Sequence, residues 1–257
     1  MEKIKLGAQL YTLREFIKTA EDTEKTFAFL QSIGISAAQI SGIGDIDPQT
    51  VAELVSRFGL DICVTHKPFE RLQNDLDNLI AEHKMIDCPS IGIGGMPDEY
   101  RGSKEGIQRF IADTTDIGAR MKAQGMQFAY HNHAFEFERY DGRTIMDMLI
   151  EDTDPDLFHF IPDTHWAQVG GVNPPDFLRS LAGRVEVCHF KDYKIVSNER
   201  KFAEIGTGNL NLDECFKACQ EIGVKYIVIE QDSCDIDPRE SMAISYRNLC
   251  ELAARHQ

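Results

Sequence analysis

Four side chains that can bind a metal ion stand where apolar segments of the sequence end. His131, Asp163 and His189 each follow a run of apolar residues, and Glu230 follows the apolar run 226–229. Imidazole and carboxylate donors suit Mn²⁺, Zn²⁺, Co²⁺ or Mg²⁺, and an ion with an open coordination position can polarise a substrate carbonyl or hydroxyl. The pattern predicts a divalent metal ion as cofactor, provided that the four segment ends meet in space.

The elements that could bring these residues together alternate regularly along the chain. Short β-branched or aromatic segments, typical of strands, are at 4–11, 36–40, 60–66, 90–94, 126–131, 158–163, 185–190 and 226–230. Amphipathic segments, typical of helices, are at 23–33, 48–58, 72–85, 104–124, 143–151, 174–182, 212–222 and 238–254.

Eight strand–helix units of roughly 32 residues each favour a barrel over a doubly wound sheet. No Gly-x-Gly-x-x-Gly turn follows the first predicted strand, as a dinucleotide-binding sheet would require. We therefore predict an α/β fold, a (β/α)₈ TIM barrel that forms a single domain over residues 1–257. The carboxyl ends of barrel strands form one mouth, where active sites lie. The four metal-capable residues are expected there.

Several longer motifs resemble those of the xylose isomerase-like TIM barrel superfamily, in particular its sugar phosphate isomerases/epimerases and inosose dehydratase-like proteins. The matching segments follow one another in the order expected and span nearly the whole chain: 7–14, 130–137, 163–166, 189–192, 205–210 and 229–232. The resemblance is specific for the superfamily and says little about the substrate.

This resemblance implies a metal held by a Glu, Asp, His and Glu, which carries over to Asp163, His189 and Glu230. Many relatives have the first Glu at the end of the fifth strand, where this sequence has His131. We favour Glu136 as the fourth ligand because it restores the Glu/Asp/His/Glu composition, with His131 or His133 as the alternative. A histidine that is not a ligand is well placed to act as a general base, since imidazole titrates near neutral pH.

Other polar residues at the predicted mouth complete the candidate site. Lys191 is predicted to act in catalysis as an electrostatic clamp on the substrate; the alternative is a salt bridge to Asp192 or Asp232. Side chains expected to bind the substrate are Gln9, Tyr11, His66, Lys67, His165 and Trp166.

The main functional hypothesis is a metal-dependent isomerase or epimerase of a sugar, keto-sugar or sugar phosphate that works through an enediolate. One alternative is a lyase or dehydratase that eliminates from a 3-keto-sugar, 3-keto-glycoside or inosose. Another is a sugar-binding barrel without catalysis. An apurinic-site endonuclease on the same scaffold is disfavoured, because it needs a basic groove.

Charge and composition limit the classes of molecule that this protein is expected to bind. The formal net charge of −15 opposes nucleic-acid binding and favours a neutral sugar over a sugar phosphate, unless Lys67, Lys191 and Arg14 form a local basic patch. No apolar run approaches the roughly 20 residues that span a membrane. Residues 1–5 lack the features of a secretory signal, and the seven scattered cysteines are read as reduced thiols, so a cytoplasmic location is expected. A homo-oligomer is compatible with the sequence.

Overall fold

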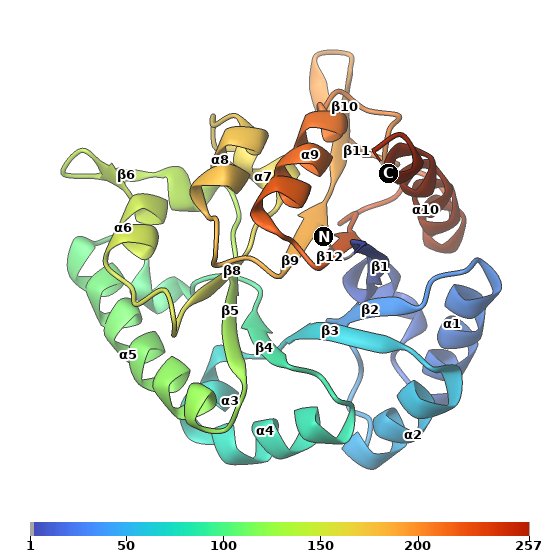
Figure 1. Cartoon of the computed structure of the whole chain (residues 1–257), viewed down its shortest axis with the longest axis horizontal. Coiled ribbons are helices and arrows are strands. Elements are labelled where there is room, and N and C mark those ends of the chain that lie inside the picture. Colours follow the sequence, from blue (N-terminus) through green and yellow to red (C-terminus); the bar gives the residue numbers. More distant parts are fainter. Residues whose placement is uncertain (1–2, 257) are drawn as a thin grey trace.

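The computed structural model describes residues 3–256 and has the architecture of a closed (β/α)₈ barrel (Figure 1). Residues 1, 2 and 257 of the predicted domain, including the start of the segment 1–5, lie outside the described residues. The barrel strands are β1 (Lys5–Gln9), β2 (Ala37–Ile40), β3 (Asp61–His66), β4 (Ser90–Ile93), β5 (Gln127–His131), β8 (His159–Ile161), β9 (Val187–Phe190) and β12 (Tyr226–Ile229).

All neighbouring pairs of these strands are parallel, in the order β8-β5-β4-β3-β2-β1-β12-β9. Isolated bridges from Phe160 to Val185 and from Asp163 to His189 link β8 to β9 and close the ring. Closure places all carboxyl ends at one mouth, because every strand runs in the same direction. The predicted fold class is confirmed.

Helices form the outer ring around the strands (Figure 1). The α-helices are α1 (Ala20–Ser32), α2 (Pro48–Phe58), α3 (Phe69–Asn74), α4 (Leu76–Met85), α5 (Lys104–Ala123), α6 (Ile145–Glu151), α7 (Thr164–Val169), α8 (Pro174–Ser180), α9 (Leu212–Ile222) and α10 (Pro238–Ala254). Three short 3₁₀ segments are η1 (Leu10–Phe16), η2 (Asp98–Tyr100) and η3 (Phe135–Phe137).

Two apolar layers hold the barrel together. The larger one lies between strands and helices, and the smaller one consists of Cys63, Val64, Ala129, Ile161, Val187 and Val228. Successive strand residues point to opposite faces. At the end of β3, Thr65 bonds His83 of α4 in the outer layer, with 2.7 Å between Oγ1 and Nε2, while the His66 ring packs near the rings of His131 and His189.

Local side-chain chemistry explains where several predicted elements begin or end differently. β1 stops at Gln9, whose Oε1 accepts the Tyr11 amide and starts η1, so Tyr11 lies beyond the strand. The predicted helix 72–85 breaks at Asp75, whose backbone is non-helical at φ −141°, and becomes α3 and α4. The strand predicted at 158–163 ends at Ile161, because Pro162 has no amide hydrogen and Asp163 caps α7.

Two hairpins are additions to the predicted pattern. β6 (Arg139–Tyr140) pairs with β7 (Arg143–Thr144), and β10 (Asp192–Val196) pairs with β11 (Glu199–Ala203), both antiparallel. The β10–β11 hairpin directly follows the strand that carries His189. No helix within residues 3–256 combines the length and apolar character needed to cross a membrane.

Candidate metal centre

Four buried side chains meet at the carboxyl ends of adjacent strands β5, β8, β9 and β12. His131, Asp163, His189 and Glu230 each offer one ligand atom, and these atoms all lie within 4.8 Å of one another. Two imidazoles and two carboxylates so close together fit a divalent ion such as Zn²⁺ or Mn²⁺. The sequence-predicted residues Asp163, His189 and Glu230 are therefore brought together, with His131 beside them.

Asp163 is oriented by the start of α7. Its Oδ1 accepts the Trp166 amide at 2.8 Å as a helix cap, and its own amide donates to Asn132 Oδ1 at 3.1 Å. Asp163 Oδ2 accepts no well-aligned hydrogen bond from the described residues. Burial raises the pKa of Asp163 to about 6. The cap thus holds one carboxylate oxygen and leaves the other free to meet a cation.

His189 makes contacts through both ring nitrogens. Nδ1 lies 3.0 Å from Glu230 Oε2, and Nε2 lies 2.7 Å from Gln39 Oε1. An ion bound by His189 would replace one of these contacts. Gln39 lies near the carboxyl end of β2, and a polar residue at that end of a strand is the signal for a mouth residue. The candidate site predicted from the sequence nevertheless leaves Gln39 out.

Glu136 lies apart from this group. Its buried carboxylate accepts the Tyr130 hydroxyl at 2.6 Å and the His133 amide at 2.8 Å, and both partners hold it against the turn that includes η3. Burial raises the pKa of Glu136 to about 7, against its ordinary value of 4.5. The structure does not bring Glu136 to the four-residue group; His131 is the residue from this segment that lies there.

Two further imidazoles flank the group. The His133 ring lies 4.9 Å from that of His131, and the His66 ring lies 5.4 Å from His131, measured between centroids. Burial, with a smaller effect from the Lys191 ammonium, lowers the pKa of His133 to about 4, and burial lowers that of His66 to about 3. Both rings are thus neutral at neutral pH. His133 Nδ1 has no hydrogen-bond partner among the described residues.

Lys191 reaches the centre of the acidic cluster. Its ammonium lies 3.0 Å from Asp163 Oδ2, 2.8 Å from Glu230 Oε2 and 3.1 Å from Asp232 Oδ2. Asp192, the other partner considered from the sequence, instead accepts the amides of Tyr193, Gly206, Gly208 and Leu210.

The β10–β11 hairpin covers another part of the predicted substrate wall. The buried His165 ring packs against Trp166 and Phe202, with centroids 4.8 Å away in both cases, and neither nitrogen of His165 has a partner among residues 3–256. On the other side of the mouth, Gln9 is buried and its Nε2 has no hydrogen-bond partner within residues 3–256, while Tyr11 is 38% exposed. The predicted substrate-binding residues are thus spread around the mouth.

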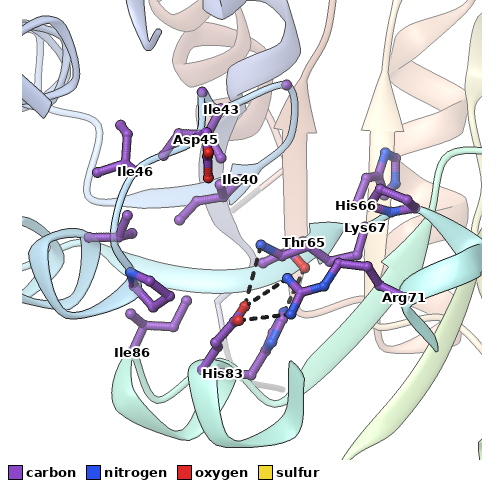
Figure 2. A pocket seen from close by; sticks show the side chains of 16 residues that line it. Ile40, Ile43, Asp45, Ile46, Thr65, His66, Lys67, Arg71, His83 and Ile86 are labelled. Atoms are coloured by element: carbon purple, nitrogen blue, oxygen red, sulfur yellow. Dashed lines mark hydrogen bonds and ion pairs between the residues drawn. The ribbon is translucent and has the colours of Figure 1, made fainter. Parts of the chain in front are cut away.

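A cavity of about 700 Å³ lies beside the third strand (Figure 2). One wall is apolar, with Ile40, Ile43, Ile46, Val51 and Ile86; the other is polar, with Thr65, Lys67, Arg71, Glu82 and His83. Glu82 pairs with Arg71 at 2.9 Å and with Lys67 at 4.0 Å. Of the predicted site residues, only His66 and Lys67 line this cavity, and none of the four metal-capable residues does.

Comparisons with known proteins agree with this architecture. A sugar phosphate isomerase/epimerase from Parabacteroides distasonis has a TM-score of 0.80 at 22% identity, over 99% of this chain and 95% of that chain. The IOLI protein, solved with a zinc atom, has a TM-score of 0.75 at 12% identity, over 99% of both chains.

Comparisons of sequence identify relatives of the same family. An inosose dehydratase from Geobacillus kaustophilus is 37% identical over 70 residues, which are 27% of this chain and 22% of the relative, so the match covers less than a quarter of that protein's length. The family model described as xylose isomerase-like TIM barrel matches residues 27–251, most of the chain. This chain belongs to the xylose isomerase-like TIM barrel family.

Proposed function

We propose that this protein is a metal-dependent isomerase or epimerase of a sugar or keto-sugar. The observation that carries the proposal is the buried group of two imidazoles and two carboxylates at the barrel mouth. The ligands would be His131, Asp163, His189 and Glu230, with His131 in the place for which the sequence favoured Glu136. A bound divalent ion would polarise the substrate carbonyl and so acidify the neighbouring carbon.

His133 is the proposed general base. Its ring is neutral, lies next to His131 and has one nitrogen without a partner in the described part of the chain, so it can take a proton from the acidified carbon of a bound substrate. The His133 imidazolium formed in this way can return the same proton, whereas delivery to the opposite face of the carbon would need a second, protonated group. Return to a different carbon gives isomerisation, and return to the other face of the same carbon gives epimerisation.

A dehydratase or lyase is the second candidate, favoured by the similarity to inosose dehydratase. The same proton abstraction would then be followed by loss of a hydroxyl or glycosidic group from the adjacent carbon. Inosose dehydratases match 70 to 161 residues, up to 56% of the chain, and a probable 3-DHS dehydratase from Bacillus anthracis has a TM-score of 0.74. The sugar phosphate isomerase/epimerase from Parabacteroides distasonis has a TM-score of 0.80, and we therefore rank isomerisation or epimerisation first.

A neutral substrate fits the charges at the mouth better than a sugar phosphate. The three cations that could form a phosphate site are all engaged: Lys191 by three carboxylates, Lys67 by Glu82, and Arg14 by the carbonyl oxygens of Tyr11 and Asp232. We expect kcat/KM to favour an unphosphorylated keto-sugar over its matched phosphate. A tenfold preference for the phosphate, lost in Lys67→Ala, would contradict this choice.

The deciding experiment is solvent deuterium exchange. Purified protein loaded with Mn²⁺ or Zn²⁺ is incubated in D₂O with a panel of keto-sugars and inososes, and NMR follows the C–H signals. Exchange at the carbon next to the carbonyl supports the proposal, and an epimer, isomer or unsaturated product identifies the outcome. Asp163→Asn serves as the inactive control. No exchange with any substrate in the panel would favour the non-catalytic alternative. A cytoplasmic location remains part of the proposal.

A further inference from the structure

Beside the proposed metal site, the ammonium group of Lys191 is itself a cation held by carboxylates. Lys191 is 1% exposed, and its ammonium lies within 3.1 Å of three carboxylates, two of which belong to the proposed metal ligands. Lysine is ordinarily protonated at neutral pH, and three carboxylates at this distance favour the ammonium form.

The backbone leaves Lys191 little choice of position. The Lys191 amide donates to Thr164 Oγ1 at 3.1 Å, and the Thr164 hydroxyl lies 3.1 Å from the Lys191 carbonyl oxygen, so both backbone polar groups of Lys191 are tied to the start of α7. The ammonium also lies 5.3 Å from the centre of the Trp166 ring. Movement of the charge must therefore come from the flexible side chain.

The two cations would share two carboxylate side chains. Asp163 Oδ2 and Glu230 Oε2, the two oxygens nearest to Lys191, belong to side chains that also offer ligand atoms to the metal group. Asp232 differs from them: it contacts Lys191, lies outside the metal group, and its side chain is 28% exposed. Like charges close together in a buried site repel strongly, because little water screens them.

We propose that the Lys191 ammonium competes with the divalent ion for the carboxylates of Asp163 and Glu230. This inference rests on the proposed metal-dependent function. Without the ion, the ammonium keeps the buried carboxylates neutralised and in place. When the ion binds, the ammonium gives up the two shared carboxylates and stays paired with Asp232. Lys191 thus lowers the affinity for the ion, and Asp232 raises it by holding the displaced charge.

The test is ion affinity rather than activity. The full chain is stripped with a chelator and titrated with Mn²⁺ by calorimetry. Lys191→Met, which keeps the length of the side chain and removes its charge, should lower the Kd for Mn²⁺ at least tenfold. Lys194→Met is the matched control, because it removes one positive charge from the same segment. The Lys194 ammonium lies 3.9 Å from Asp235 rather than against the metal-capable group, so this variant should change the Kd for Mn²⁺ less than threefold.

Asp232→Asn provides a second variant, in case Lys191→Met folds poorly. In the wild-type background, Asp232→Asn should weaken Mn²⁺ binding at least fivefold. In a Lys191→Met background it should weaken binding clearly less, because that protein has no ammonium group for Asp232 to hold. Melting curves add an independent measurement: Lys191→Met should melt lower than wild type without ion, and Mn²⁺ should raise its melting temperature more.

The outcomes separate this inference from the proposed function. If wild type binds Mn²⁺ and Lys191→Met binds equally or more weakly, the competition is wrong while the metal proposal stands. Unchanged binding by Asp232→Asn also overturns the competition. If neither wild type nor Lys191→Met binds, both ideas are overturned. Binding by Lys191→Met alone supports the competition and contradicts metal dependence in the natural chain.

Discussion

His131 and Glu136 illustrate how much five residues of separation matter at the mouth of a barrel. His131 is the last residue of β5 and lies in the metal-capable group, whereas Glu136 lies in η3 and is held by Tyr130 and His133. The Glu136 carboxylate therefore positions the segment that carries His133. Its effect on chemistry is expected to act through that histidine.

Replacing these two residues separates ligand from positioning residue. His131→Ala should abolish or strongly weaken Zn²⁺ binding, because it removes one of four donors. Glu136→Gln should keep the ion and lower the free energy of unfolding by about 1–3 kcal/mol, since a buried hydrogen-bond acceptor is replaced by an amide that suits its donors less well. Elemental analysis after dialysis and urea unfolding measure the two effects. Loss of Zn²⁺ in Glu136→Gln would restore the ligand assignment favoured from the sequence.

A second substitution tests the general base. His133→Asn should leave ion binding intact and lower kcat by about 10²–10⁴-fold, the usual contribution of general-base catalysis, once a substrate is known. His159→Asn is the matched control, since His159 opens β8 at the opposite end of the barrel. An equal loss of rate in both variants, or loss of the ion in His133→Asn, would contradict the assignment.

At the scale of elements, two hairpins have turn residues that suit them. Asp141 and Gly142 both have positive φ between β6 and β7, as do Ser197 and Asn198 between β10 and β11. Such positions favour Gly, Asn and Asp, and two-residue loops of this kind match the twist of a hairpin. These signals are present in the sequence, but the flanking strands are short or polar and show no clear hydrophobic alternation.

The long helix α5 packs against the chain segment before β8 through Gly118. A Cβ atom at this position would clash with the Leu157 carbonyl oxygen. Alanine normally stabilises a helix by about 1 kcal/mol over glycine. Here we expect Gly118→Ala to destabilise the protein by about 1–3 kcal/mol, because the backbones must separate.

The neighbouring position provides the control for this substitution. Ala119 is exposed on the same helix, and Ala119→Gly should cost only the intrinsic propensity of about 1 kcal/mol. Urea unfolding followed by circular dichroism measures both variants. If Gly118→Ala proves stabilising, the contact between α5 and residue 157 is looser than the structure indicates.

At the scale of the whole molecule, buried imidazoles link stability to pH. His83, in the outer layer, is buried and bonded to Thr65, and burial lowers its pKa to about 4. In the unfolded chain this pKa returns to about 6.5. Between these values the unfolded state binds more protons, so the contribution of His83 to stability is present above pH 6.5 and is lost as the pH falls toward 4.

We expect the free energy of unfolding to fall more steeply between pH 7 and pH 5 in wild type than in His83→Gln. The difference should be about 2 kcal/mol at pH 5, from 1.36 kcal/mol per pKa unit. Urea unfolding at several pH values measures it. Comparing the two proteins isolates His83 from Glu136 and Asp163, whose raised pKa values act in the opposite direction. Equal slopes would show that His83 is accessible to protons in the folded state.

The order of strands and helices could be predicted from the sequence because each follows from local chemistry. Alternating apolar segments, the Asp47-Pro48 start of α2 and the left-handed Gly59 at its end are short-range signals. The same pattern, with the known direction of strands in a barrel, was enough to predict that Asp163, His189 and Glu230 share one mouth.

Only the tertiary structure decided which atoms meet there. The choice of His131 over Glu136 depends on the turn after β5 and on Tyr130, and the Gln39–His189 contact joins residues 150 positions apart. Likewise, the sequence allows Lys191 to pair with Asp192 or with Asp232. In the structure the Asp192 carboxylate accepts backbone amides from the segment 206–210, and Lys191 pairs with Asp232. Local patterns specify elements, but side-chain partners depend on distances between strands that only the closed barrel sets.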